Sequence, residues 1–252
     1  MKKIALLREL EKYPVFTLET VMRILKKERN YIKLVIHRLK KEGLIFKIEK
    51  NKYTLHKDPI LVASNIVWPS YLGFWSALRH HNLTEQLPQK ISVITTRSRK
   101  NYQIEFAGTE IFFTKVNPGY FFGFKKEIYN DFIIFVSDPE KTLIDSALFK
   151  RISFMEISEI IKENFDDINA ERIIQYALKT KSNALVKRFG FLFDNLGKDF
   201  FYIIGNAIGN LSSNYVLLDY SMPEEGKNTD NTDNSKNKNK NKKWRIIENV
   251  KL

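Results

Sequence analysis

The chain has 252 residues, lacks cysteine and carries 42 Lys and Arg against 29 Asp and Glu, a formal net charge of +13. The lack of cysteine excludes disulfide bonds and thiolate-bound zinc or iron–sulfur sites, and it favours a cytoplasmic protein. Apolar residues make up 43% of the chain, enough to form a folded core. Apolar runs such as 132–136 are too short for a signal peptide or a membrane span, so we expect neither.

The positive charge is concentrated in two segments of the chain. Residues 1–57 hold 16 Lys and Arg against six Asp and Glu, and residues 227–243 hold six Lys against two Asp. Net charges of +10 and +4 in these segments leave the remainder at about −1. A general lysine bias would raise the charge everywhere. The localisation therefore predicts a basic N-terminal module that binds a polyanion.

The first predicted elements are three short helices. Residues 2–12 place Ile and Leu at helical spacing and end at Tyr13-Pro14. Thr17 is a suitable N-cap for a second helix, in which Glu19 complements the positive helix end. The third helix is predicted over 29–42 and ends at Gly43, the residue type that a left-handed C′ position prefers.

A hairpin follows these helices. Two β-type runs, 44–49 and 52–55, are joined through Lys50-Asn51. Three short helices followed by a hairpin is the order of a winged helix-turn-helix, and the spacing Leu39-x-x-x-Gly43-Leu44-Ile45 resembles the end of its recognition helix and its wing entry. We therefore assign residues 1–57 to a winged helix-turn-helix DNA-binding domain.

The third helix carries the candidate DNA-binding face. Its buried side contains Ile32, Val35, Ile36 and Leu39, whereas Leu34 lies on the opposite side among polar residues. Asn pairs with adenine, and Lys or Arg pairs with guanine or phosphate. The predicted DNA-binding residues are Arg29, Asn30, Lys33, His37 and Lys41 on the helix, with Lys50 and Lys52 at the wing tip. The alternative is an ordinary solvated helix face.

The region after a short linker at 56–59 predicts an α+β domain. Helices are expected over 60–67 and 71–81, the second with a core-forming aromatic stripe. Strand-like runs follow, separated by turn signals, and we expect them to form an antiparallel sheet. These runs cover 91–96, 102–106, 110–115 and 132–136.

Asp138-Pro139-Glu140-Lys141 begins another predicted helix. Its residues resemble the carboxylate–lysine cluster of a metal nuclease, an alternative that uses Asp138 and Glu140. A helix start explains the same residues without chemistry, because Asp is a good N-cap, Pro is favoured at the first position and Glu complements the helix dipole. We favour the helix start.

The C-terminal part is predicted to be mainly helical. Helices are expected over 154–195 and 199–208, and strands over 215–218 and 244–247. Between these strands, residues 227–243 contain no apolar residue and are expected to form a disordered insertion. The insertion is either a passive loop or a nonspecific nucleic-acid contact.

No catalytic or metal-binding pattern stands out in the sequence. His37 lies on the presumed recognition helix, His56 lies in the linker, and His80-His81 form an adjacent pair without a partner at zinc-binding spacing. Glycine-rich phosphate loops and nucleophile elbows are also missing from the sequence. We therefore expect no enzyme activity, no cofactor and no metal.

Two motifs resemble the AbiEi family of type IV toxin–antitoxin antitoxins. The first is the stretch from Pro69 to Gln86, followed by Ile91 to Thr96, and the second is the helix entry from Asp138 to Asp145. The closing segments 215–220 and 244–250 are similar to the C-terminal strands of that family, here separated by the lysine–asparagine insertion.

This resemblance implies a cytoplasmic autorepressor and antitoxin with an α+β fold. A winged helix-turn-helix would bind double-stranded DNA at the protein's own promoter. Residues 58–252 would form a larger mixed α+β antitoxin domain with a helical segment, including the insertion at 227–243. This domain would counter a nucleotidyltransferase-type toxin without requiring a stable complex with it, and the Pro69–Gln86 motif is a candidate for the neutralising surface. The alternative function is a ligand-responsive winged-helix transcriptional regulator unrelated to toxin–antitoxin systems.

Overall fold

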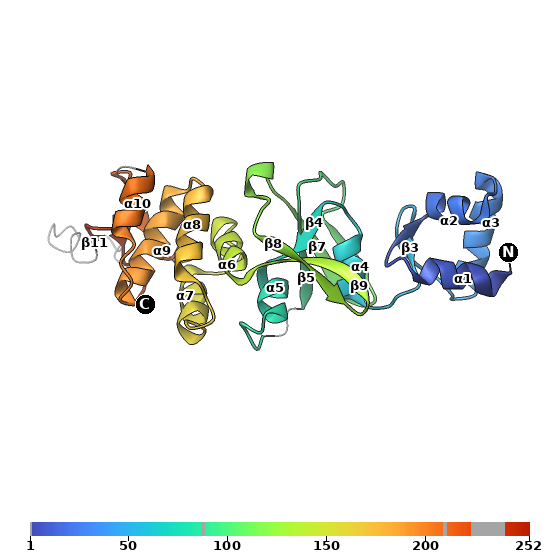
Figure 1. Cartoon of the computed structure of the whole chain (residues 1–252), viewed down its shortest axis with the longest axis horizontal. Coiled ribbons are helices and arrows are strands. Elements are labelled where there is room, and N and C mark those ends of the chain that lie inside the picture. The colour runs from blue at the N-terminus through green and yellow to red at the C-terminus, as the bar shows by residue number, and fades with distance from the viewer. Residues whose placement is uncertain (1, 87–88, 209–210, 223–239) are drawn as a thin grey trace, which may run out of the picture. The chain divides into compact units, whose positions relative to one another are not determined.

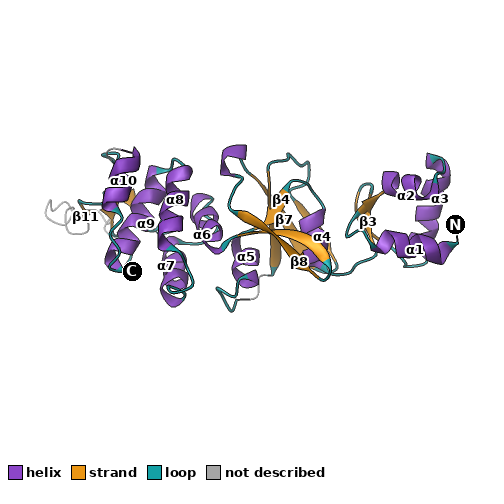
Figure 2. Cartoon of the chain, in the orientation of Figure 1, coloured by secondary structure: helices purple, strands orange, loops and turns teal. Residues whose placement is uncertain are grey.

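The computed structural model describes residues 2–86, 89–208, 211–222 and 240–252, and these residues form an α+β fold. The chain divides into two compact units, one of residues 1–76 and 87–137 and the other of residues 77–86 and 138–252. Strands predominate in the middle of the chain and helices near its C-terminal end, as the colouring in Figure 2 shows. Within the described ranges, no helix is long and apolar enough to cross a membrane.

The N-terminal module has the three helices and the hairpin that the sequence predicts (Figure 1). A short additional strand, β1, pairs with β3 and completes a three-stranded sheet of order β1-β3-β2. The elements are α1 (Lys3–Glu11), β1 (Phe16–Thr17), α2 (Leu18–Leu25), α3 (Arg29–Lys41), β2 (Phe46–Glu49) and β3 (Lys52–Thr54). The core that holds them contains Leu6, Leu10, Phe16, Leu18, Val21, Ile32, Ile36, Leu39 and Ile45.

The predicted helix boundaries in this module follow from local chemistry. The Thr17 hydroxyl accepts a hydrogen bond from the Thr20 amide at 3.4 Å, and the Thr20 hydroxyl accepts one from the Thr17 amide at 3.3 Å. These reciprocal bonds satisfy two amides that the helix leaves unpaired. Gly43 follows Glu42, the C-cap residue of α3, and has φ of +70°, a conformation that glycine adopts without steric cost. Both predicted caps are confirmed.

The middle of the chain forms a six-stranded sheet of order β6-β7-β5-β4-β9-β8. Its strands are β4 (Ser70–Leu72), β5 (Lys90–Thr95), β6 (Gln103–Phe106), β7 (Thr109–Lys115), β8 (Phe124–Tyr129) and β9 (Phe132–Ser137). A short 3-10 helix, η1 (Pro118–Tyr120), follows β7. The sheet is mixed, because β5 pairs with β7 and β4 pairs with β9 in parallel. The prediction of an antiparallel sheet is therefore wrong for β5 with β7, and it is confirmed for β6 with β7.

The predicted helix over 71–81 is also wrong at its start. Residues 70–72 form β4, and the helix α5 (Phe74–His80) begins only at Phe74. The positive φ of Phe74, +51°, separates the strand from the helix. Tyr71 is fully buried, with ring centroids 5.1 Å from Phe121 and 4.8 Å from Phe124. Tertiary packing of this ring overrides the helical spacing. The preceding helix, α4 (Pro59–Asn65), is confirmed and packs against β5 and β9.

The second unit is mainly helical. Its helices are α6 (Pro139–Leu148), α7 (Phe154–Glu163), α8 (Ala170–Lys179), α9 (Asn183–Asn195) and α10 (Phe201–Ile208). A small sheet of order β10-β12-β11 is formed by β10 (Val216–Leu217), β11 (Lys240–Asn241) and β12 (Ile246–Ile247). Trp244 is fully buried and fits over Gly190 of α9, where an added Cβ would clash with the indole ring. Glycine is therefore required for this close approach.

The predicted insertion at 227–243 includes an ordered end. Residues 227–239 lie outside the described residues. Residues 240–241 form β11, and the Lys243 ammonium lies 2.7 Å from an Asp194 carboxylate oxygen and 3.4 Å from one of Asp199. The expectation of disorder is wrong for 240–243, because strand pairing and these ion pairs fix a segment that has no apolar residue of its own.

Candidate nucleic-acid interface

Helix α3 is held by one apolar side and presents the other to solvent. Ile32, Ile36 and Leu39 are 5% exposed or less and belong to the core of the module. Because an α-helix repeats every 3.6 residues, burial at these spacings directs positions 30, 34, 37 and 41 outward. The outward positions form a continuous stripe along the helix.

The predicted DNA-binding residues of α3 are all exposed. Arg29, Asn30, Lys33, His37 and Lys41 each lie on the solvent side of the helix. Over its 13 residues, α3 has five Lys or Arg and no Asp or Glu, so the helix itself supplies no compensating charge. The Arg29 guanidinium lies 3.3 Å from a Glu19 carboxylate oxygen of α2. Both partners of this pair are exposed, so it contributes little stability.

The two predicted wing lysines have different environments. Lys50 is exposed at the hairpin turn. The Lys52 ammonium instead donates to the Ile66 carbonyl oxygen at 2.6 Å and pairs with Glu49 at 2.8 Å, and its side chain is only 27% exposed. Arg99 completes this cluster through a 2.6 Å contact with Glu49 and lies 3.9 Å above the Phe113 ring. We therefore leave Lys52 out of the proposed interface.

Sequence reasoning missed further cations around the same face. Arg38 and Lys40 lie on the two flanks of the α3 stripe, and Lys26 and Lys27 precede the helix; all four are exposed. The sequence could have identified Arg38 and Lys40 by their positions on the helix, and Lys26 and Lys27 by their closeness to its start. They extend the basic surface on both sides of the stripe.

The wing turn is attached to the start of α2 by Asn51. The Asn51 amide donates to a Glu19 carboxylate oxygen at 2.9 Å, and its carbonyl oxygen accepts from the Leu18 amide at 3.1 Å. The Asn51 hydrogen bond is the largest of several contributions that lower the pKa of Glu19 to about 2. Further contributions come from the backbone amide of Glu19, from Thr17 and from Arg29. Asn51 thus fixes the wing relative to the helices.

We expect Asn51→Gly to raise the pKa of Glu19 toward its ordinary value, because glycine preserves the positive φ of this position and removes the amide donor. A lowered folded-state pKa stabilises the fold above the unfolded value of 4.5, and this contribution is lost as the pH falls toward 2. The variant should therefore lose less stability than the wild type over this range. Carboxylate NMR titration measures the pKa. An unchanged pKa of Glu19 in the variant would contradict the role assigned to the Asn51 hydrogen bond.

The carboxylate–lysine cluster at the start of α6 is occupied by structural contacts. The Asp138 carboxylate accepts from the Lys141 amide at 2.7 Å and from the Tyr176 hydroxyl at 2.8 Å. Burial is the main cause of the raised pKa of Asp138. It is also the main cause of the raised pKa of Tyr176, which is about 12. Glu140 accepts from the Asn169 amide at 3.0 Å. These contacts support the predicted helix start and join α6 to the beginning and middle of α8.

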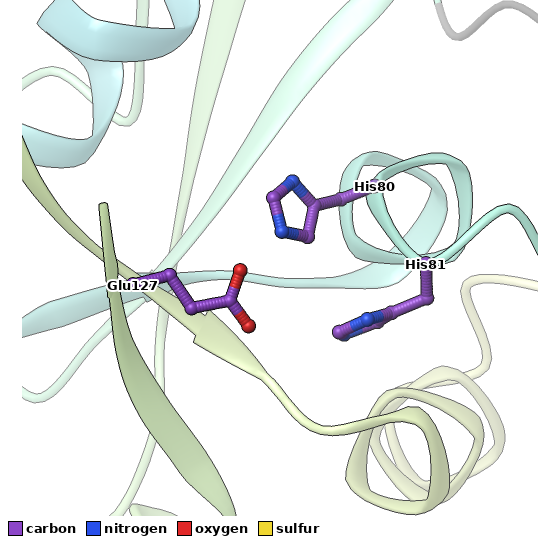
Figure 3. A group of neighbouring side chains, drawn as sticks. All are labelled: His80, His81 and Glu127. Carbon is purple, nitrogen blue, oxygen red and sulfur yellow. The ribbon is translucent and has the colours of Figure 1, made fainter. Parts of the chain in front are cut away.

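The adjacent histidines lie at the end of α5. Figure 3 shows their two imidazole rings, and also Glu127, which belongs to β8. The His80 and His81 rings are arranged edge to face with their centroids 5.3 Å apart. One such pair supplies two nitrogen ligands, fewer than the three or four protein ligands of zinc sites. We assign no metal to this pair.

The Pro69–Gln86 motif contributes mainly core residues. Tyr71, Leu72, Phe74 and Leu78 are buried. Arg79 is exposed, and its guanidinium donates to the Thr84 carbonyl oxygen at 3.2 Å. A motif with this pattern of burial is explained by packing, which weakens its candidacy as the neutralising surface.

Comparisons with known proteins give a structural likeness alone. No family model matches the chain, and no curated protein matches it. The fold is similar to that in the crystal structure of the Rv2827c protein from Mycobacterium tuberculosis, with a TM-score of 0.60 and 13% sequence identity. The match covers 96% of this chain and 88% of the mycobacterial chain. At this identity the likeness establishes the shared fold.

Proposed function

We propose that the protein is a DNA-binding transcriptional autorepressor and the antitoxin of a type IV toxin–antitoxin system. The exposed face of α3 supports the first role. Its basic and amide side chains are those that read bases and bind phosphate in the major groove, and the helix has no acidic residue to repel DNA. The proposed interface comprises Arg29, Asn30, Lys33, His37, Lys41 and Lys50.

Binding of the full chain to its promoter should depend strongly on salt. If the protein neutralises about five phosphates, the logarithm of the association constant should fall with the logarithm of salt concentration at a slope of roughly −4 to −5. Fluorescence anisotropy with a labelled promoter duplex at several salt concentrations measures the slope. A slope near zero would remove the electrostatic basis of the proposal.

Single substitutions distinguish base contacts from phosphate contacts. Asn30→Ala should cost about 1–3 kcal/mol on the promoter and relax sequence preference if Asn30 reads a base, whereas Lys50→Ala should weaken promoter and random duplexes alike. Lys52→Ala should change affinity less than Lys50→Ala, because the Lys52 ammonium is bound within the protein. Lys126→Ala on β8 removes the same exposed charge far along the chain and is the matched control.

The antitoxin role rests on the resemblance of the Pro69–Gln86 and Asp138–Asp145 segments to the AbiEi family. Protection would act against a nucleotidyltransferase-type toxin, without a stable complex. We expect the gene for such a toxin beside the gene for this protein. Expression of the toxin should harm cells that lack this protein and be tolerated in cells that contain it. Absence of protection in that assay would remove the antitoxin role and leave the repressor role standing.

A ligand-responsive regulator is the second candidate, favoured by a pocket in the helical unit. The pocket has a volume of about 420 Å³ and lies beside α9 and the C-terminal segment. Its lining combines the apolar residues Phe191, Leu196 and Leu218 with the charged residues Lys162, Glu248 and Lys251. Two results together would favour this function over the first. A small molecule would release the protein from promoter DNA, and the gene would have no toxin gene beside it.

A further inference from the structure

A leucine lies at the centre of the polar face of α3. The Leu34 side chain is 59% exposed, although leucine is an apolar residue that packing usually buries. It follows Asn30 by four residues and precedes His37 by three and Lys41 by seven, so all four side chains lie along one stripe (Figure 1 shows the helix). A lone exposed leucine is ordinary. The position of this one within the candidate reading stripe gives it a chemical role.

The charges around Leu34 select the kind of surface that covers it. Lys33 and Lys40 lie on one flank of the stripe and Arg38 lies on the other, and all three are exposed. An apolar protein partner would have to bury these cations without counter-charges, which is costly. A DNA duplex supplies phosphates on both sides of the major groove and base edges between them. Charge complementarity therefore points to duplex DNA.

We propose that Leu34 reads thymine by contact with its C5-methyl group in the major groove. This proposal rests on the DNA-binding function proposed above and specifies what the helix recognises. Thymine is the base that presents a methyl group in that groove, and apolar side chains contact it there. Asn30, one turn earlier, presents an amide of the kind that pairs with adenine. The stripe is thus chemically suited to an A·T-containing half-site.

Replacing thymine with uracil tests this assignment, because uracil pairs identically and lacks only the methyl group. The promoter duplex is prepared with either base, and dissociation constants of the full chain are measured by fluorescence anisotropy. Wild-type protein should bind the uracil duplex about fourfold more weakly for each contacted methyl group, the factor expected for burying one such group. Leu34→Ala should weaken binding to the thymine duplex and abolish most of the difference between the two duplexes.

Two further variants make the comparison specific. Leu34→Met retains an apolar side chain of similar volume and should preserve the preference for thymine. Ile4→Ala removes a similarly exposed apolar side chain (66% against 59%) that belongs to α1 and not to the α3 stripe, and it should leave the thymine-to-uracil ratio at its wild-type value. Because uracil also changes duplex flexibility, the Leu34-dependent part of the ratio is the quantity that reports direct contact.

The outcomes separate the two proposals. Tight, salt-dependent binding with equal affinity for both duplexes would overturn thymine reading and leave the DNA-binding function intact. A thymine preference that persists unchanged in Leu34→Ala would overturn the assignment to Leu34. Failure of the wild-type chain to bind either duplex would overturn the DNA-binding function, and thymine reading with it.

Discussion

Replacement of Asp145 by alanine should lower the free energy of unfolding by about 3–5 kcal/mol, because it removes the carboxylate that pairs with a buried ammonium. Lys141 and Asp145 are one turn apart in α6, are both fully buried and pair with each other. Removing a charge from water costs several kcal/mol, which the pair offsets by mutual attraction and hydrogen bonding. Chemical denaturation followed by circular dichroism measures the loss.

The loss in Asp145→Ala should become smaller as the pH rises. Burial lowers the pKa of Lys141, and the Asp145 carboxylate opposes this effect, so its removal lowers the pKa of Lys141 further. Between the folded-state pKa of the variant and the higher folded-state pKa of the wild type, the folded variant has lost this proton, whereas the folded wild type and both unfolded chains keep it. Stability of the variant therefore increases with pH across that window. A deficit that does not change with pH would show that Lys141 stays protonated.

Two controls define what this experiment reports. The double substitution Lys141→Met with Asp145→Leu replaces both charges with apolar groups and should recover most of the lost stability, since buried pairs are often replaceable in this way. Glu42→Ala breaks the exposed pair with Lys3 and should cost less than about 1 kcal/mol. A similarly small cost for Asp145→Ala would contradict the importance assigned to the buried pair.

Local chemistry made much of the fold predictable. Thr17, Gly43 and Asp138 each satisfy a helix end through their own side chain or backbone freedom, so the sequence identifies these boundaries without tertiary information. The apolar spacing of Ile32, Ile36 and Leu39 likewise identifies the outward face of α3. The exposed positions of the candidate site were predictable for the same reason.

Features that depend on distant partners were not predictable. Strand β8 is an edge strand with no fully buried residue, so its sequence lacks the apolar alternation of a half-buried strand. Parallel pairing of β5 with β7 arises because β6 occupies the far side of β7. The prediction that Lys52 binds DNA could not include its hydrogen bond to the Ile66 carbonyl, because that contact depends on how the chain returns after the wing.

The proposed repressor and antitoxin roles should be separable by two substitutions on α3. Lys33→Ala combined with Lys41→Ala removes two exposed cations from the stripe, and neither belongs to the core, so stability should change by no more than about 0.5 kcal/mol per site. If each lysine contributes about 1 kcal/mol or more to DNA binding, affinity for the promoter should fall at least about thirtyfold. A promoter–reporter fusion and anisotropy with the promoter duplex measure the two effects.

The same double variant should still protect cells from the toxin when it is expressed from an unrelated promoter. The proposed antitoxin role places protection in residues 58–252, which both substitutions leave intact, so growth with the toxin should match that given by the wild-type protein. Lys125→Ala with Lys126→Ala on β8 removes an equal charge outside α3 and should leave repression unchanged. If the α3 double variant is folded and expressed at the wild-type level but fails to protect, protection depends on DNA binding. An independent antitoxin role for the C-terminal region would then be wrong.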